Sequence, residues 1–187
     1  MNYLEMVKQC TVDYKKQIEN IKDQKEKLKK QLDNEIIGQR FYSDQCHELD
    51  KNVNEVYENG KKEVDKINSS FKEFQRFKYG VKGNDVIPED LELFRGDFEI
   101  TQADADRLKE KYIKAKNYTM LNALKKYAKE KGLKVVYEVQ EAEETFQFDL
   151  FSDYCKTAMI DNLIYENIEE MYQKVTAHFE ELDKKGV

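Results

Sequence analysis

Residues 4–32 read LEMVKQCTVDYKKQIENIKDQKEKLKKQL, and an apolar side chain recurs in this stretch at intervals of three and four. This spacing is the heptad pattern of an amphipathic helix that packs against another helix. Thr11 and Lys25 interrupt the pattern with polar side chains. We call its apolar residues the N-terminal seam, and they are Leu4, Val7, Tyr14, Ile18, Ile21, Leu28 and Leu32.

The same heptad frame continues to about residue 78, and the only proline of the chain is Pro88. One continuous helix over about residues 3–78 would be about 110 Å long. Gly38 and Gly60 lie inside this stretch, and a glycine costs a helix about 1 kcal/mol relative to alanine. We therefore expect a continuous or gently bent helix, with a break near Gly38 as the main alternative and a bend at Gly60 as another.

A turn-rich stretch, YGVKGNDVIPED at residues 79–90, divides the chain. It predicts a long N-terminal helix over residues 1–80, a small helical head over 81–140 and a long C-terminal helix over 141–187. The last part has an apolar helical period, and residues 141–185 contain neither glycine nor proline. In this interpretation the C-terminal helix packs back on the N-terminal helix, so these two helices would be antiparallel.

Capping residues predict the helices of the head. Thr101 followed by Asp104 has the spacing of a capping box, and Asn117 or Thr119 suits the start of the next helix. Gly132 suits the end of that helix. The head is therefore expected to be helical as well.

These observations predict an all-α fold. It would be an elongated antiparallel coiled-coil hairpin, or a three-helix bundle, with a small helical head inserted between the long helices. The composition agrees, since 37% of the residues are charged and only 7 are glycine. The C-terminal helix is too short to cover the N-terminal seam of a continuous helix. The seam would then lie against a second copy in a homodimer, or the chain would fold back near Gly38 and cover it internally.

The charges are unevenly distributed, although the formal net charge is only −6. A lysine-rich stretch in the N-terminal helix is a candidate contact for an anionic partner. Because the whole chain has 32 basic residues of which few are arginine, recognition of nucleic acid is disfavoured. The lysines of this stretch are Lys15, Lys16, Lys22, Lys25, Lys27, Lys29 and Lys30.

No pattern of catalytic, cofactor-binding or metal-ligating residues is recognisable. The chain has 3 cysteines far apart and 2 histidines, which do not have the paired spacing of a zinc site. Glycine-rich phosphate loops are missing. We interpret the acidic residues around Glu144 as a solvated helix face, and the aromatic residues of FKEFQRFKYG (71–80) as core. The expectation is a protein without enzymatic activity, cofactor or metal. It would be cytoplasmic, because no signal peptide or membrane span is recognisable.

One part of the head resembles a known group of proteins. Residues 91–133 are similar to small helical proteins encoded in tailed-phage and prophage structural gene clusters. The residues that carry the resemblance are Leu91, Leu93, Gly96, Ile100, Thr101, Leu108, Tyr112, Asn117, Thr119, Met120, Leu121, Tyr127 and Ala128. The resemblance implies a non-enzymatic role in virion morphogenesis, with phage structural proteins as partners and a location in the host cytoplasm or the virion.

The leading hypothesis is therefore a structural or assembly protein that acts through protein–protein contacts, including contacts with itself. One alternative is a nucleic-acid-binding module that uses the lysine-rich stretch. Another is a cellular coiled-coil adaptor. No membrane partner is expected.

Overall fold

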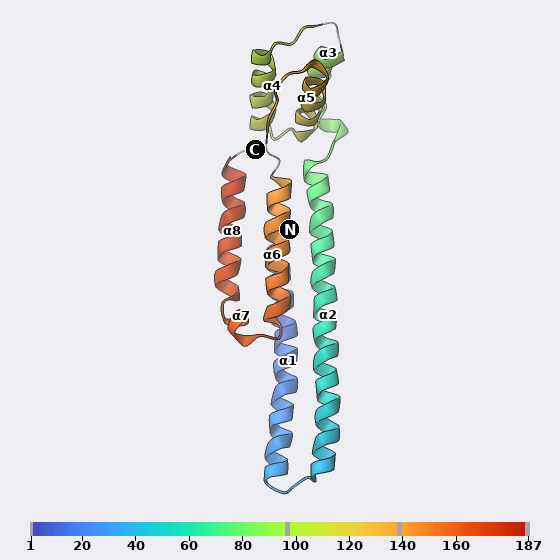
Figure 1. Cartoon of the computed structure of the whole chain (residues 1–187), viewed down its shortest axis with the longest axis vertical. Coiled ribbons are helices and arrows are strands. Elements are labelled where there is room, and N and C mark those ends of the chain that lie inside the picture. The colour runs from blue at the N-terminus through green and yellow to red at the C-terminus, as the bar shows by residue number, and fades with distance from the viewer. Residues whose placement is uncertain (1, 96–97, 138–139, 186–187) are drawn as a thin grey trace. The chain divides into compact units, whose positions relative to one another are not determined.

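The computed structural model describes residues 2–95, 98–137 and 140–185, and these residues contain helices and no strand (Figure 1). The predicted all-α class is thereby confirmed. Gly96, one of the residues that carry the resemblance, lies outside the described residues. The helices are α1 (Tyr3–Asp33), α2 (Gln39–Tyr79), α3 (Pro88–Arg95), α4 (Gln102–Lys114), α5 (Tyr118–Lys131), α6 (Glu141–Ala158), α7 (Asn162–Glu166) and α8 (Ile168–Lys185), with one 3-10 turn, η1, at Gly83–Asp85.

The chain reverses direction between α1 and α2, so the expected continuous helix over residues 3–78 is wrong. At the end of α1 the amide of Ile36 donates to the carbonyl of Gln31 at 2.8 Å. The amide of Glu35 donates to the carbonyl of Leu32 at 2.9 Å, and Glu35 has a φ of 56°. These bonds and the left-handed residue make a Schellman motif, which ends a helix. The reversal lies at residues 34–38, so the alternative expectation of a break near Gly38 is confirmed.

After this reversal α2 runs antiparallel to α1. The Tyr3 and Phe71 rings meet edge to face with centroids 5.7 Å apart, and Lys25 Nζ lies 2.6 Å from Asp50 Oδ1. Residues whose numbers add up to about 75 therefore lie beside one another in the two helices. The N-terminal seam faces α2 of its own chain.

Two compact units make up the chain, and each is described by itself. Unit one consists of residues 1–71 and 147–176. Its core joins α1 and α2 to α6 and α8, and the Phe71 and Phe148 rings are stacked within it at 4.0 Å. The buried apolar residues of this core are Leu4, Val7, Ile18, Val64, Ile67, Phe71, Phe148, Phe151, Cys155, Ala158, Met159, Ile168 and Val175.

Gly60 neither breaks nor ends α2, because its missing side chain makes room for neighbours. A Cβ atom at Gly60 would lie 2.7 Å from Met159 Sδ and 2.9 Å from Tyr14 Cγ. Real Cβ atoms do not come that close to other atoms. The absence of a side chain at Gly60 therefore allows α1 and the turn after α6 to approach α2 closely.

The C-terminal part is not one long helix, so the expected uninterrupted helix over residues 141–187 is wrong. α6 ends at Ala158, and Asp161 then caps α7 by accepting hydrogen bonds from the amides of Leu163 and Ile164. The Phe151 and Tyr172 rings lie 6.2 Å apart, which brings α6 and α8 together. An aspartate N-cap can start a new helix without any glycine or proline.

Unit two consists of residues 72–146 and 177–187, so it is larger than the expected head over residues 81–140. The capping predictions are confirmed here: Thr101 and Asp104 form a capping box, and Asn117 caps α5. Gly132 ends α5 with a φ of 72°. The core of this unit is made by Ala105, Tyr112, Met120, Leu121, Leu124, Ala128, Val135 and Tyr137.

Candidate functional site

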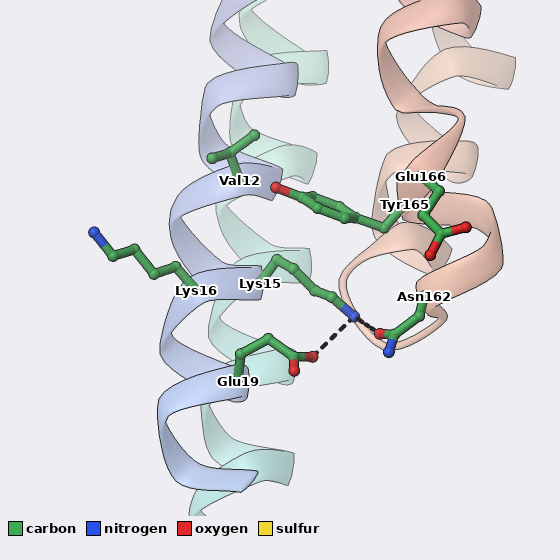
Figure 2. Close-up of a pocket in the computed structure, with 7 residues that line it drawn as sticks. All are labelled: Val12, Lys15, Lys16, Glu19, Asn162, Tyr165 and Glu166. Carbon is green, nitrogen blue, oxygen red and sulfur yellow. Dashed lines mark hydrogen bonds and ion pairs between the residues drawn. The ribbon is translucent and has the colours of Figure 1, made fainter. Parts of the chain in front are cut away.

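A groove with a volume of about 510 Å³ lies in unit one between α1 and α7 (Figure 2). Lys15 crosses it from the α1 side and is only 4% exposed. Its Nζ donates a hydrogen bond to Asn162 Oδ1 and lies 3.1 Å from Glu19 Oε1. The groove is lined by Val12, Lys15, Lys16, Glu19, Asn162, Tyr165 and Glu166.

Lys15 is buried because it occupies a core-facing position of α1, between Thr11 and Ile18. A buried ammonium group is tolerated only with close partners. Asn162 supplies one from the first turn of α7, and the Tyr165 ring supplies another, with its centroid 5.5 Å from Nζ. Lys15 therefore joins α1 to α7.

The groove has no excess of positive charge. Two ammonium groups, of Lys15 and Lys16, stand against the carboxylates of Glu19 and Glu166. Burial by itself would raise the pKa of Glu19, but hydrogen bonds from Lys22 and Lys15 outweigh it and lower the pKa of this carboxyl. The groove connects α1 to α7 and its charges are balanced, so it has no feature that favours binding of an anion.

The lysine-rich stretch does not form one free basic surface. Lys15 and Lys22 both pair with Glu19, and Lys25 pairs with Asp50 of α2. The anion contact predicted from the sequence is therefore reduced by ion pairs within the chain. The exposed members of the stretch are Lys16, Lys27, Lys29 and Lys30.

The N-terminal seam is not left uncovered for a second copy, which corrects the premise of the predicted self-association. Leu4, Val7 and Ile18 are buried in the core of unit one. The other four members are partly buried, and they are Tyr14, Ile21, Leu28 and Leu32. The reason is the reversal at residues 34–38, which lays α2 against the seam.

Among the described residues of unit one, those nearest this reversal belong to two helices, α1 and α2. We call residues 19–56 the distal hairpin. None of its described side chains is buried, whereas the buried residues of α1 lie at 4–18 and those of α2 in unit one at 60–71. In Figure 1 this end of α1 and α2 extends past α7. Its surface is therefore available for contacts outside the chain.

Two large apolar side chains are exposed where the distal hairpin turns. Ile36 is 69% exposed and Phe41 is 52% exposed. We call these two residues the hairpin tip. In a Schellman motif the second residue after the helix cap frequently packs on an apolar residue in the last turn of the helix. That residue is Ile36 here, and it lies opposite the polar Gln31, which agrees with its exposure.

A second exposed apolar surface lies at the end of α2 in unit two, which corrects the interpretation of FKEFQRFKYG as core. Phe71 and Tyr79 are buried, but Phe77 is 69% exposed and Phe74 is exposed as well. The helical period explains the difference, because residues 71, 75 and 79 share one face and residue 77 lies on another. Gln75 occupies the buried position between them.

The carboxylate of Glu144 is buried, so it does not belong to a solvated helix face. Its Oε1 accepts hydrogen bonds from Lys78 Nζ and Tyr79 Oη at 2.8 Å, and its Oε2 accepts one from Gln75 Nε2 at 2.5 Å. Among the described residues, none hydrogen-bonds to Gln75 Oε1. This network joins the start of α6 to the end of α2 within unit two.

Burial raises the pKa of two thiols, and one histidine pairs with a carboxylate. Burial raises the pKa of the Cys155 thiol to about 12 and that of Cys10 to about 11, which makes both poor nucleophiles. His178 Nε2 lies 3.2 Å from Glu143 Oε1. Within the described ranges, no group of three or more His, Cys, Asp or Glu side chains could hold a metal ion.

Sequence reasoning missed the residues that turned out to be most informative. Ile36 and Phe41 lie around Gly38, and two adjacent isoleucines at a suspected break were the available signal. Asn162 and Tyr165 lie in a segment expected to continue one helix, where only the Asp161–Asn162 pair indicated a cap. Lys15 is their partner in the groove, and no local pattern in the sequence predicts that this lysine is buried.

In the part of the chain that the structure describes, no helix combines the length and the apolar character needed to cross a membrane. Comparison with known proteins identifies no relative: no family model, no curated protein and no solved structure matches this chain.

Proposed function

We propose that the protein is a non-enzymatic structural or assembly protein that acts through protein–protein contacts, with the hairpin tip as the contact element. The observation that carries this proposal is the exposure of Ile36 and Phe41 at the end of a hairpin without buried side chains. In this proposal α1 and α2 form an antiparallel coiled coil that presents the tip.

Energetics favour a partner at this position. Burial of an aliphatic or aromatic side chain of this size is worth about 1.5–3 kcal/mol. Aromatic residues are enriched among the side chains that dominate protein interfaces. The backbone hydrogen bonds of Ile36 and Glu35 to the last turn of α1 hold the turn in one conformation, so binding would require little ordering of the tip.

The resemblance of residues 91–133 to proteins of phage structural gene clusters supports virion morphogenesis as the setting. In that setting the partner is a structural protein of the virion, and the protein acts in the host cytoplasm or in the virion. A cellular adaptor would use the same tip on a cellular protein. The genes next to the coding sequence distinguish these two settings.

The test places a photo-crosslinking amino acid at position 41 of the full chain in the cells that produce the protein. Adducts are identified by mass spectrometry, and a cross-linker at the exposed Phe98 serves as the control. We expect position 41 to give adducts with one or a few defined proteins, and Ile36→Asp to abolish them. Equal adducts with abundant cellular proteins from both positions would refute the proposal.

The alternative of nucleic-acid binding through the lysine-rich stretch has less support. Three of its seven lysines form ion pairs within the chain. Titration with DNA at low and moderate salt tests it, because binding to phosphates weakens steeply as salt rises.

A further inference from the structure

The end of α2 and the loop that follows it form an exposed surface that is both aromatic and basic. Lys82 Nζ lies 4.8 Å from the centroid of the Phe77 ring, and Arg76 is exposed beside it. A groove of about 510 Å³ adjoins the ring. It is lined by Arg76, Phe77, Gly80, Val81, Lys82, Gly83, Asn84 and Asp85.

We propose that this surface binds single-stranded nucleic acid, with an unpaired base stacked on Phe77 and the adjoining phosphates held by Arg76 and Lys82. The proposal goes beyond the function proposed above, which uses the hairpin tip in unit one. The two surfaces share no residue, so either proposal can fail without the other.

The shape of the surface suits a base. An exposed aromatic ring next to cations is the arrangement on which successive bases of a single strand stack, largely independent of their sequence. Gly83 lies along the groove, and apart from its chain neighbours no atom lies within 4 Å of the position that its Cβ atom would take. A planar ligand can therefore approach the backbone closely.

The charge near the ring is locally positive although the chain is acidic. Residues 72–82 contain four basic residues and one acidic residue, Glu73. Lys78 is neutralised by the buried Glu144, at 2.8 Å. Asp85 is the one carboxylate among the residues that line the groove. Arg76 and Lys82 are thus the two side chains placed to hold phosphates.

Two phosphate contacts define a salt dependence. For single strands the logarithm of the affinity falls with the logarithm of the salt concentration by about 0.7 per phosphate. A slope of about −1.4 follows, so raising salt from about 50 mM to about 200 mM weakens binding about 7-fold. A base within a duplex has no free face for Phe77, so a duplex should bind at least about 5-fold more weakly than a single strand.

The experiment measures fluorescence anisotropy of labelled DNA and RNA strands of about ten nucleotides, and of the matching duplex, with the full chain. We expect Phe77→Ala to weaken binding about 5- to 150-fold. Phe77→Tyr, which keeps the ring, should bind like the unmodified protein, and Phe77→Leu should behave like the alanine variant. Lys82→Ala should reduce the salt slope by about 0.7.

Two control variants make the result specific. Phe98→Ala removes another exposed aromatic side chain of unit two and should leave binding unchanged. The double variant Lys27→Ala/Lys30→Ala removes exposed lysines of the lysine-rich stretch and should also bind normally. Thermal unfolding by circular dichroism confirms that each variant is folded.

Several results would overturn the proposal. One is the absence of binding at about 100 µM protein in about 50 mM salt. Binding by Phe77→Leu at the unmodified level, or equal affinity for the duplex, would show that no base stacks on the ring. Loss of binding only in the Lys27→Ala/Lys30→Ala variant would assign the activity to the lysine-rich stretch instead.

Discussion

The substitution Gly60→Ala separates what local helix propensity predicts from what the packing of unit one predicts. Alanine in the middle of α2 should stabilise the helix by about 1 kcal/mol relative to glycine. The structure predicts the opposite sign, because the new Cβ atom would lie 2.7 Å from Met159 Sδ and 2.9 Å from Tyr14 Cγ. Met159 is fully buried.

The size of the effect follows from these two contacts. Overpacking a core costs about 1–3 kcal/mol, and clashes with two groups from different segments of the chain place Gly60→Ala near the upper value. Tyr14 Cγ sits next to its backbone, so relief on that side requires a shift of α1. After the helix gain of about 1 kcal/mol is subtracted, the protein should be about 2 kcal/mol less stable. For a chain of this length the melting temperature falls by about 4–8 °C.

Urea denaturation followed by far-UV circular dichroism measures this change. Ser70→Ala, an exposed change in the same helix, is the control and should shift stability by less than about 0.5 kcal/mol. Gly60→Ala should be less harmful in a Met159→Ala background, because one of the two clashes is then removed. A higher urea midpoint for Gly60→Ala than for the unmodified protein would refute the close contact.

Three further predictions concern the turn, the thiols and one carboxylate. Glu35→Gly should raise stability by about 0.5–1 kcal/mol in the same urea assay, because glycine adopts the positive φ of this residue without strain; a lower midpoint would contradict the Schellman motif. With Ellman's reagent the partly exposed Cys46 should react in the native protein, whereas Cys155, whose pKa burial raises to about 12, should react only after unfolding; rapid native reaction of Cys155 would contradict its burial. Burial would raise the pKa of Glu19, but hydrogen bonds from lysines outweigh burial and lower this pKa in the folded state. The ionised Glu19 carboxylate therefore stabilises the fold above its unfolded pKa of about 4.3. This contribution is lost as pH falls through the folded pKa. The difference in urea midpoint between the unmodified protein and Glu19→Gln should therefore be constant near neutral pH and disappear in acid, and a difference independent of pH would rule out the ion pairs.

The sequence alone determined the helical class and several helix ends. Scarce glycine and proline together with apolar periods of three and four predicted the helices, and the capping box at Thr101 and Asp104 was correct. Asn117 and Gly132 also have their predicted capping roles. These features depend on hydrogen bonds between residues a few positions apart, so local sequence is sufficient to specify them.

Only the tertiary structure decided where the long helices end and which of their faces are covered. The turn at residues 34–38 and the break after Ala158 allow α1, α2, α6 and α8 to share one core. The same packing buries Lys15 and leaves Ile36 exposed. Heptad spacing shows that an apolar face needs a partner, but it does not show which segment provides it. That choice depends on contacts between residues far apart in the chain, and here it lays α2 along the N-terminal seam and buries Leu4, Val7 and Ile18 in the core of unit one.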